Sequence, residues 1–137
     1  MATVRDALVN ARDKVVVVTP FIDQSGIKLL EESWRTKAND ASWEIYVRSA
    51  NEGLRKTAER LGWKLFEYPE AADSGMHAKI VSIDKDRVII GSMNLLRRSM
   101  YSNLEIGVDI TEDPIVAKMT RLEGWLQEVS VRVKPEH

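Results

Sequence analysis

Four consecutive valines, 15–18, constrain the fold of this 137-residue chain more than any other feature. They begin an apolar run over 15–22 that predicts a β-strand, because β-branched residues favour extended backbone. A strand that is apolar on both faces must be covered on both sides, as is the central strand of a helix-flanked sheet. Pro20 is expected to end the run, since proline cannot donate a hydrogen bond to a neighbouring strand.

The remaining chain alternates between helical and extended patterns, which predicts an α/β fold with a mixed β-sheet flanked by helices. We expect one domain over 1–137 and a loose tail over 130–137. The further strands are expected over 43–49, 63–67, 77–83, 88–92 and 103–110. The helices are expected over 3–13 with Thr3 as N-cap, over 26–37, between Asn51 and Gly62, and from Asp113 and Pro114 onward.

Two of these strands, 77–83 and 88–92, are separated only by the polar residues 84–87. Two extended segments joined by so short a polar segment predict a β-hairpin. The preceding loop, 69–75, consists of small and polar residues and is expected to act as a connector or as a lid.

The hairpin brings polar side chains together at its open end. If its loop is symmetric about its two central residues, Lys79 faces Ser92 and His77 faces Asn94; an odd loop length would shift this pairing by one residue. Asp84 is different, because it lies seven residues along the strand from His77, roughly 23 Å away at about 3.3 Å per residue. We therefore expect Asp84 to be a turn or structural residue.

This cluster has the chemistry of a phosphate site. A neutral imidazole is a nucleophile at pH 7, and lysine, serine and asparagine supply donors for a tetrahedral oxyanion. A carboxylate is needed to orient the imidazole, and Glu105, on the polar face of 103–110, is the candidate. Taken singly, His77 fits a buried core histidine, Ser92 and Asn94 fit turn residues after Gly91, and Glu105 fits a solvent-exposed face. Their combination favours a site.

Composition narrows the chemistry further. The chain has no cysteine and only two histidines, His77 and His137, which favours a mechanism without a metal or other cofactor. The formal net charge is −1, so no overall basic field indicates nucleic acid. Residues 79–98 nevertheless contain five basic and two acidic side chains, and Arg97 and Arg98 are expected to guide an anionic substrate or else to lie in a solvated loop.

Targeting signals are not recognisable in the sequence. No apolar run approaches the roughly 20 residues of a membrane span, and the N-terminal residues lack the apolar core of a signal peptide. A cytoplasmic protein without a membrane span is therefore expected, either as a whole protein or as part of a larger chain or complex.

The segment from His77 to Glu105 resembles the signature of the phospholipase D superfamily: H-x-K, four residues, D, six residues, G-S-x-N. The resemblance extends over roughly 15–129 and implies a phospholipase D-like domain. Members with two such motifs build one active site from both. A chain with a single motif, like this one, is implied to form a homodimer whose two copies share the site, and a two-fold axis achieves this naturally.

The resemblance also implies residue roles. One His77 attacks phosphorus to form a phosphohistidine, and its mate protonates the leaving oxygen and later activates water. Lys79, Ser92 and Asn94 hold the phosphate oxygens, while Glu105 orients His77. The implied activity is a metal-independent phosphodiesterase, most simply a nuclease acting on DNA. The alternatives are a phospholipid phosphodiesterase or transferase, and a nucleic-acid-binding or assembly domain that does not turn phosphates over.

Overall fold

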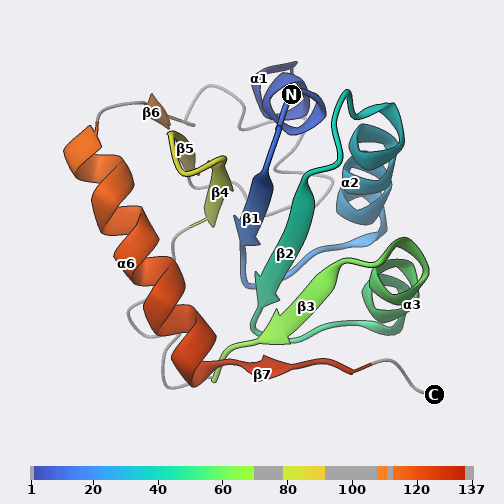
Figure 1. The fold of residues 1–137 in the computed structure, drawn as a ribbon. Helices are drawn as coiled ribbons and strands as arrows, with labels where there is room; N and C mark the ends of the chain where they lie inside the picture. The colour runs from blue at the N-terminus through green and yellow to red at the C-terminus, as the bar shows by residue number, and fades with distance from the viewer. Residues whose placement is uncertain (1, 70–78, 92–107, 111–112, 135–137) are drawn as a thin grey trace.

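In a computed structural model, the described residues are 2–69, 79–91, 108–110 and 113–134, and they contain a mixed seven-stranded sheet of order β6-β5-β4-β1-β2-β3-β7 (Figure 1). The strands are β1 Lys14–Val18, β2 Ser42–Val47, β3 Lys64–Glu67, β4 Lys79–Ile83, β5 Arg87–Gly91, β6 Val108–Ile110 and β7 Val131–Arg132. Strands β1, β2 and β3 are parallel, whereas the other pairings are antiparallel. The predicted mixed sheet is confirmed, with β1 at its centre.

Helices cover both faces of the sheet (Figure 1). They are α1 Ala2–Val9, α2 Gln24–Thr36, α3 Glu52–Leu61 and α6 Asp113–Val129. Val15 and Val17 pack into a core cluster with α1, α2 and α3, while Val16 and Val18 pack into a second cluster with Leu126 of α6. The valine run is apolar on both faces because each face has its own hydrophobic core.

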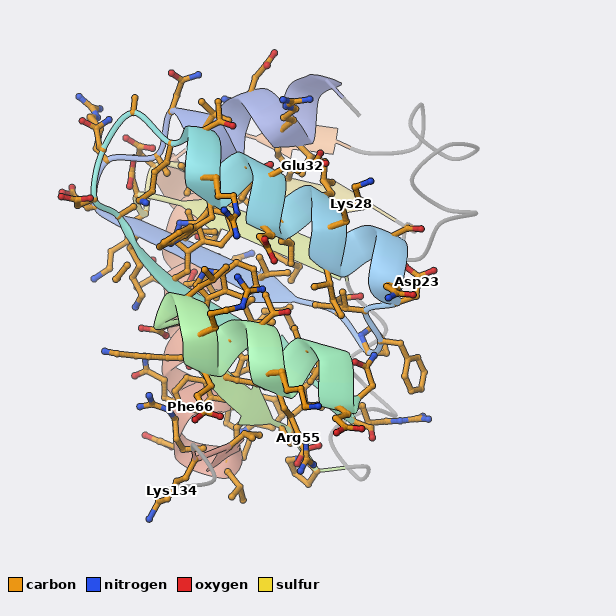
Figure 2. The ribbon with its side chains drawn as sticks, turned by 90° about the vertical axis from the view of Figure 1, so that its right-hand side faces the viewer. Asp23, Lys28, Glu32, Arg55, Phe66 and Lys134 are labelled. Carbon is orange, nitrogen blue, oxygen red and sulfur yellow. The ribbon has the colours of Figure 1, made fainter. Side chains whose placement is uncertain are left out.

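Helix α3 has the predicted ends. The Asn51 side chain accepts a hydrogen bond from the Leu54 N–H at 2.8 Å, and Gly62 adopts a left-handed conformation with φ of 76°. Helix α2 begins two residues earlier than expected, because the Asp23 side chain accepts from the Gly26 N–H at 2.9 Å and acts as its N-cap. Figure 2 shows α2 and α3 side by side, with Asp23 at the beginning of α2.

The prediction for the first helix is wrong at both ends. Thr3 lies inside α1 rather than capping it, and the helix ends at Val9 instead of residue 13. The early end has a physical reason: the backbone N–H groups of residues 12–14 donate to the Asp84 side chain instead of continuing the helical hydrogen bonds.

The prediction of a loose tail over 130–137 is wrong for its first part. Val131 and Arg132 form β7, which pairs antiparallel with β3, and the Val133 N–H donates to the Leu65 carbonyl at 2.8 Å. Two residues are too few for an alternating pattern to be recognised in a sequence, and the edge of β3 supplies the hydrogen bonds that order them. Residues 135–137 lie outside the described part of the chain.

Candidate active site

The predicted hairpin is present, but its register differs from the symmetric pairing. Ile83 pairs with Arg87, and Lys79 pairs with Gly91 rather than with Ser92. The loop contains three residues, 84–86, so the pairing is shifted by one position. The Asp86 N–H donates to the Ile83 carbonyl at 3.1 Å, which closes a four-residue β-turn over 83–86. The two central residues of this turn, Asp84 and Lys85, have φ of 55° and 59°. Positive φ at both central positions is the pattern of a type I′ turn.

The open end of the hairpin is described only by the paired backbones of Lys79 and Gly91. The other predicted site residues lie outside the described part of the chain: His77, Ser92, Asn94, Arg97, Arg98 and Glu105. The predicted loop over 69–75 also lies outside it from residue 70 onward. Since the chain reaches Lys79 from His77 and continues from Gly91 to Ser92, the four motif positions adjoin one end of this hairpin in sequence.

Asp84 lies at the other end of the hairpin and ties it to the chain before β1. Its Oδ2 accepts from the Arg12 N–H at 2.8 Å, and its Oδ1 accepts from the Asp13 and Lys14 N–H groups at 2.6 and 2.9 Å. Partial burial acts to raise the pKa of Asp84, but these three donors outweigh it and hold the pKa below its usual range. Asp84 is therefore a tether between two segments about 70 residues apart in sequence.

Strand β1 places a second set of residues beside Lys79. Val18 pairs with Ile80, so continuation of the antiparallel register puts Thr19 level with Lys79. The parallel pairing of β1 and β2 also continues past both strands, since the Thr19 N–H donates to the Tyr46 carbonyl at 3.0 Å and the Arg48 N–H to the Pro20 carbonyl at 3.1 Å. The loops that follow β1 and β2 therefore lie at the same edge of the sheet as Lys79.

Two side chains at this edge were not predicted from the sequence. Phe21 follows the strand-ending proline and remains 37% exposed, and the guanidinium carbon of Arg48 lies 4.5 Å from the centroid of its ring. The available signal was an aromatic residue directly after Pro20, but the apolar run containing it favoured a buried position.

Hydrogen bonds from polar side chains hold these loops in place. The Asn51 amide donates to the Ile22 carbonyl at 2.7 Å, which joins the loop after β1 to the beginning of α3. The Glu67 carboxylate accepts from the Ala50 N–H at 2.8 Å and lies 3.6 Å from the Arg55 guanidinium. The edge beside Lys79 is therefore a hydrogen-bonded framework rather than a set of independent loops.

A polar cluster lies away from this edge, between the sheet and α6. Lys14 Nζ lies 3.2 Å from a carboxylate oxygen of Glu44, whose side chain is only 9% exposed. The Tyr46 hydroxyl donates to Glu44 at 3.2 Å, and the Gln127 amide reaches the same carboxylate at 3.4 Å. Burial, followed by the neighbouring Glu44 charge, raises the pKa of Tyr46 far above its ordinary value. These contacts join β1, β2 and α6.

Comparisons with known proteins identify the fold and the family. A family model described as the cardiolipin synthase, PLD-like domain matches residues 2–124. The chain therefore belongs to the phospholipase D superfamily. A comparison with curated protein sequences finds no match. None of the helices among the described residues is both long and apolar enough to cross a membrane.

Three solved structures are similar to this chain. Nuc from Salmonella typhimurium, a phospholipase D family member, matches with a TM-score of 0.73 and 11% identity over 98% of this chain and 90% of that one. NucT from Helicobacter pylori matches with a TM-score of 0.69 and 16% identity, over 96% of this chain and 89% of its own. The archaeal chromatin protein TrmBL2, which binds DNA, matches with a TM-score of 0.63 and 13% identity, over 96% of this chain and 49% of its own. These likenesses establish the phospholipase D-like fold.

Proposed function

We propose that the protein is a metal-independent phosphodiesterase that cleaves nucleic acid, with an active site shared across a homodimer. The observation that carries the proposal is the complete motif from His77 to Asn94, at every spacing, in a chain of this family. The hairpin supports it, because the backbones of Lys79 and Gly91 are paired at the end from which His77 and Ser92 extend the chain.

The proposed reaction has two displacements at phosphorus. In the first, a His77 nitrogen attacks, a P–N bond forms, and the P–O bond to the leaving group breaks as the partner's His77 protonates that oxygen. In the second, the partner's His77 removes a proton from water, which attacks phosphorus and breaks the P–N bond. Lys79, Ser92 and Asn94 stabilise the charge on the non-bridging oxygens, and Glu105 orients the attacking imidazole.

The proposed reaction calls for a homodimer, because it uses two copies of the motif histidine. It needs one histidine as nucleophile and a second as acid, but the sequence contains the motif once, and its other histidine is residue 137. A two-fold axis brings each His77 to its own mate, since an isologous contact pairs each residue with its copy.

Nucleic acid is favoured as the substrate by the structural likenesses. Two of the similar structures are Nuc and NucT, of nearly the same chain length, and a third is a DNA-binding chromatin protein. The basic excess over 79–98, with Arg97 and Arg98, suits contacts to a phosphate backbone. The net charge of −1 predicts modest affinity that falls with salt.

Two other functions have specific support. The family model carries the name of cardiolipin synthase, which favours a phospholipid phosphodiesterase or transferase. The likeness to TrmBL2 favours a domain that binds DNA without cleaving it. A binding domain would lose affinity on His77→Ala, whereas a nuclease would lose turnover and keep its affinity.

Plasmid nicking in excess EDTA tests the proposal. The wild type is expected to nick the plasmid, His77→Ala to be inactive, and His137→Ala, which removes the only other histidine, to match the wild type. Nicking by all three proteins would indicate a contaminant. Nicking by none would refute the nuclease, and hydrolysis of phospholipid vesicles by the same samples would then identify the lipid alternative.

A further inference from the structure

Phe21 and Arg48 form an exposed stack at the edge of the sheet that carries the candidate active site. The guanidinium carbon lies 4.5 Å from the ring centroid, Phe21 is 37% exposed, and Arg48 is half-buried. Among the described residues the other exposed large hydrophobic side chains are Trp125 and Val131, which belong to α6 and β7. Phe21 is therefore the exposed aromatic residue of the described edge beside Lys79.

The strand register limits how far this stack can lie from Lys79. Thr19 is level with Lys79 on the neighbouring strand, and Phe21 follows Thr19 by two residues. The chain bends at Pro20, so about 4.8 Å between strands and about 3.3 Å per residue set an upper limit of roughly 11 Å on the distance between the backbones of Phe21 and Lys79. Stacked bases repeat about every 3.4 Å along a strand. A phosphate bound at Lys79 thus places a base within a few nucleotides of Phe21.

The stack is held in position by its own framework. The Arg48 N–H donates to the Pro20 carbonyl at 3.1 Å, the Thr19 hydroxyl donates to the Phe21 carbonyl at 3.4 Å, and the Asn51 amide holds the carbonyl of Ile22. Ile22 is itself buried, so the chain is anchored directly after the exposed ring. Such a pre-ordered aromatic ring loses little conformational freedom when a ligand packs against it.

We propose that Phe21 and Arg48 bind an unpaired base of the substrate next to the cleaved phosphate, so that the protein prefers nucleic acid with unpaired nucleotides. This inference rests on the proposed function. Aromatic rings and guanidinium planes stack on bases of any sequence, whereas a base within a duplex has both of its faces covered by its neighbours. A phospholipid headgroup has no planar ring that would use such a stack.

The test is binding of a labelled oligodeoxythymidylate, and of an abasic strand with the same number of phosphates, to His77→Ala protein. Fluorescence anisotropy is measured at several salt concentrations in EDTA. Phe21→Ala added to His77→Ala is expected to weaken thymidylate binding about 5- to 30-fold, the lower part of the range for base stacking. It leaves abasic-strand binding within about twofold and the salt dependence unchanged, because no charge is removed.

Two further substitutions separate the parts of the stack. Phe21→Leu keeps an apolar side chain without the aromatic ring and is expected to behave like Phe21→Ala. Arg48→Ala weakens binding of both strands and lowers the salt slope by about one, since a cation near the phosphates is lost. Lys37→Ala is the matched control: its ammonium lies 3.6 Å from the Trp34 ring centroid, another cation–aromatic stack, but after α2 at the opposite edge of the sheet, and no effect is expected.

The outcomes distinguish this inference from the proposed function. Equal thymidylate affinity with and without Phe21→Ala, in a protein that binds the strand and whose wild type cleaves DNA, refutes the stack and leaves the nuclease standing. Equal weakening of the thymidylate and abasic strands also refutes it, because the ring would then act on the fold or the backbone. A protein that binds neither strand and nicks no plasmid overturns both.

Discussion

Replacing Asp84 with asparagine separates the structural part of the motif from its chemistry. The Asp84 carboxylate accepts three backbone hydrogen bonds, from Arg12, Asp13 and Lys14, at 2.6 to 2.9 Å. An amide keeps one acceptor oxygen and points N–H groups at the remaining donor. One charge-assisted hydrogen bond is lost, and the other two become hydrogen bonds to a neutral acceptor. Each of these three changes costs about 1–1.5 kcal/mol. Because the tether is partly exposed and water can replace part of it, we expect a loss of about 2–3 kcal/mol.

Thermal and urea unfolding measure this loss. For a domain of this size, about 2–3 kcal/mol corresponds to a fall in Tm of about 6–10 °C. Asp86→Asn is the matched control, since it removes the same charge from an exposed position of the same turn, and we expect its Tm to stay within about 2 °C of the wild type.

The stability that the Asp84 carboxylate contributes should depend on pH in a defined direction. The folded pKa of Asp84 is depressed, so its contribution is fully present above the unfolded value of about 3.9 and is lost as pH falls through the folded pKa. The stability difference between wild type and Asp84→Asn should therefore be constant from pH 5 to 8 and narrow below about pH 4.

Activity completes the test. Lys79 and Asp84 lie at opposite ends of β4, so well below its melting temperature Asp84→Asn should keep wild-type cleavage. Full stability combined with lost cleavage would refute the tether and make Asp84 a participant in the reaction.

Three further substitutions test the fold by urea unfolding. Lys85→Gly should stabilise the protein by about 0.5–1 kcal/mol, because Lys85 has φ of 59° and Asp-Gly suits a type I′ turn; a destabilised variant would contradict that turn. Lys14→Met should cost about 2–3 kcal/mol by leaving Glu44 buried without its cation, and Lys14→Met with Glu44→Met should recover most of it; additive losses would show that the pair is not coupled. Leu126→Ala should cost about 2–5 kcal/mol, since this fully buried side chain joins α6 to the sheet, and a loss below 1 kcal/mol would place α6 outside the core.

Prediction from sequence succeeded where one short pattern determines the local structure. The valine run required a covered central strand, and Asn51 and Gly62 marked the ends of α3. It failed where residues distant in sequence determine the local structure. Neither the early end of α1 nor the position of β7 can be read locally, because the first depends on Asp84 and the second on the edge of β3.

The hairpin shows the same division at finer scale. Its two strands were predictable, but its register depended on whether the loop contained an even or odd number of residues, and the pairing of Ile83 with Arg87 shows that it contains three. For the site, the motif pointed to His77 and Lys79, whereas Phe21 and Arg48 became visible only when β1 and β2 were placed beside β4.

The most direct test of the shared active site is cleavage by mixed dimers. Wild-type and His77→Ala chains are unfolded together, refolded in different proportions, and assayed for plasmid nicking in EDTA. A site that needs His77 from both chains makes mixed dimers inactive, so activity should follow the square of the wild-type fraction, about one quarter for an equal mixture. A linear dependence, with about half the activity remaining, would show that one motif suffices and would contradict the shared-site mechanism.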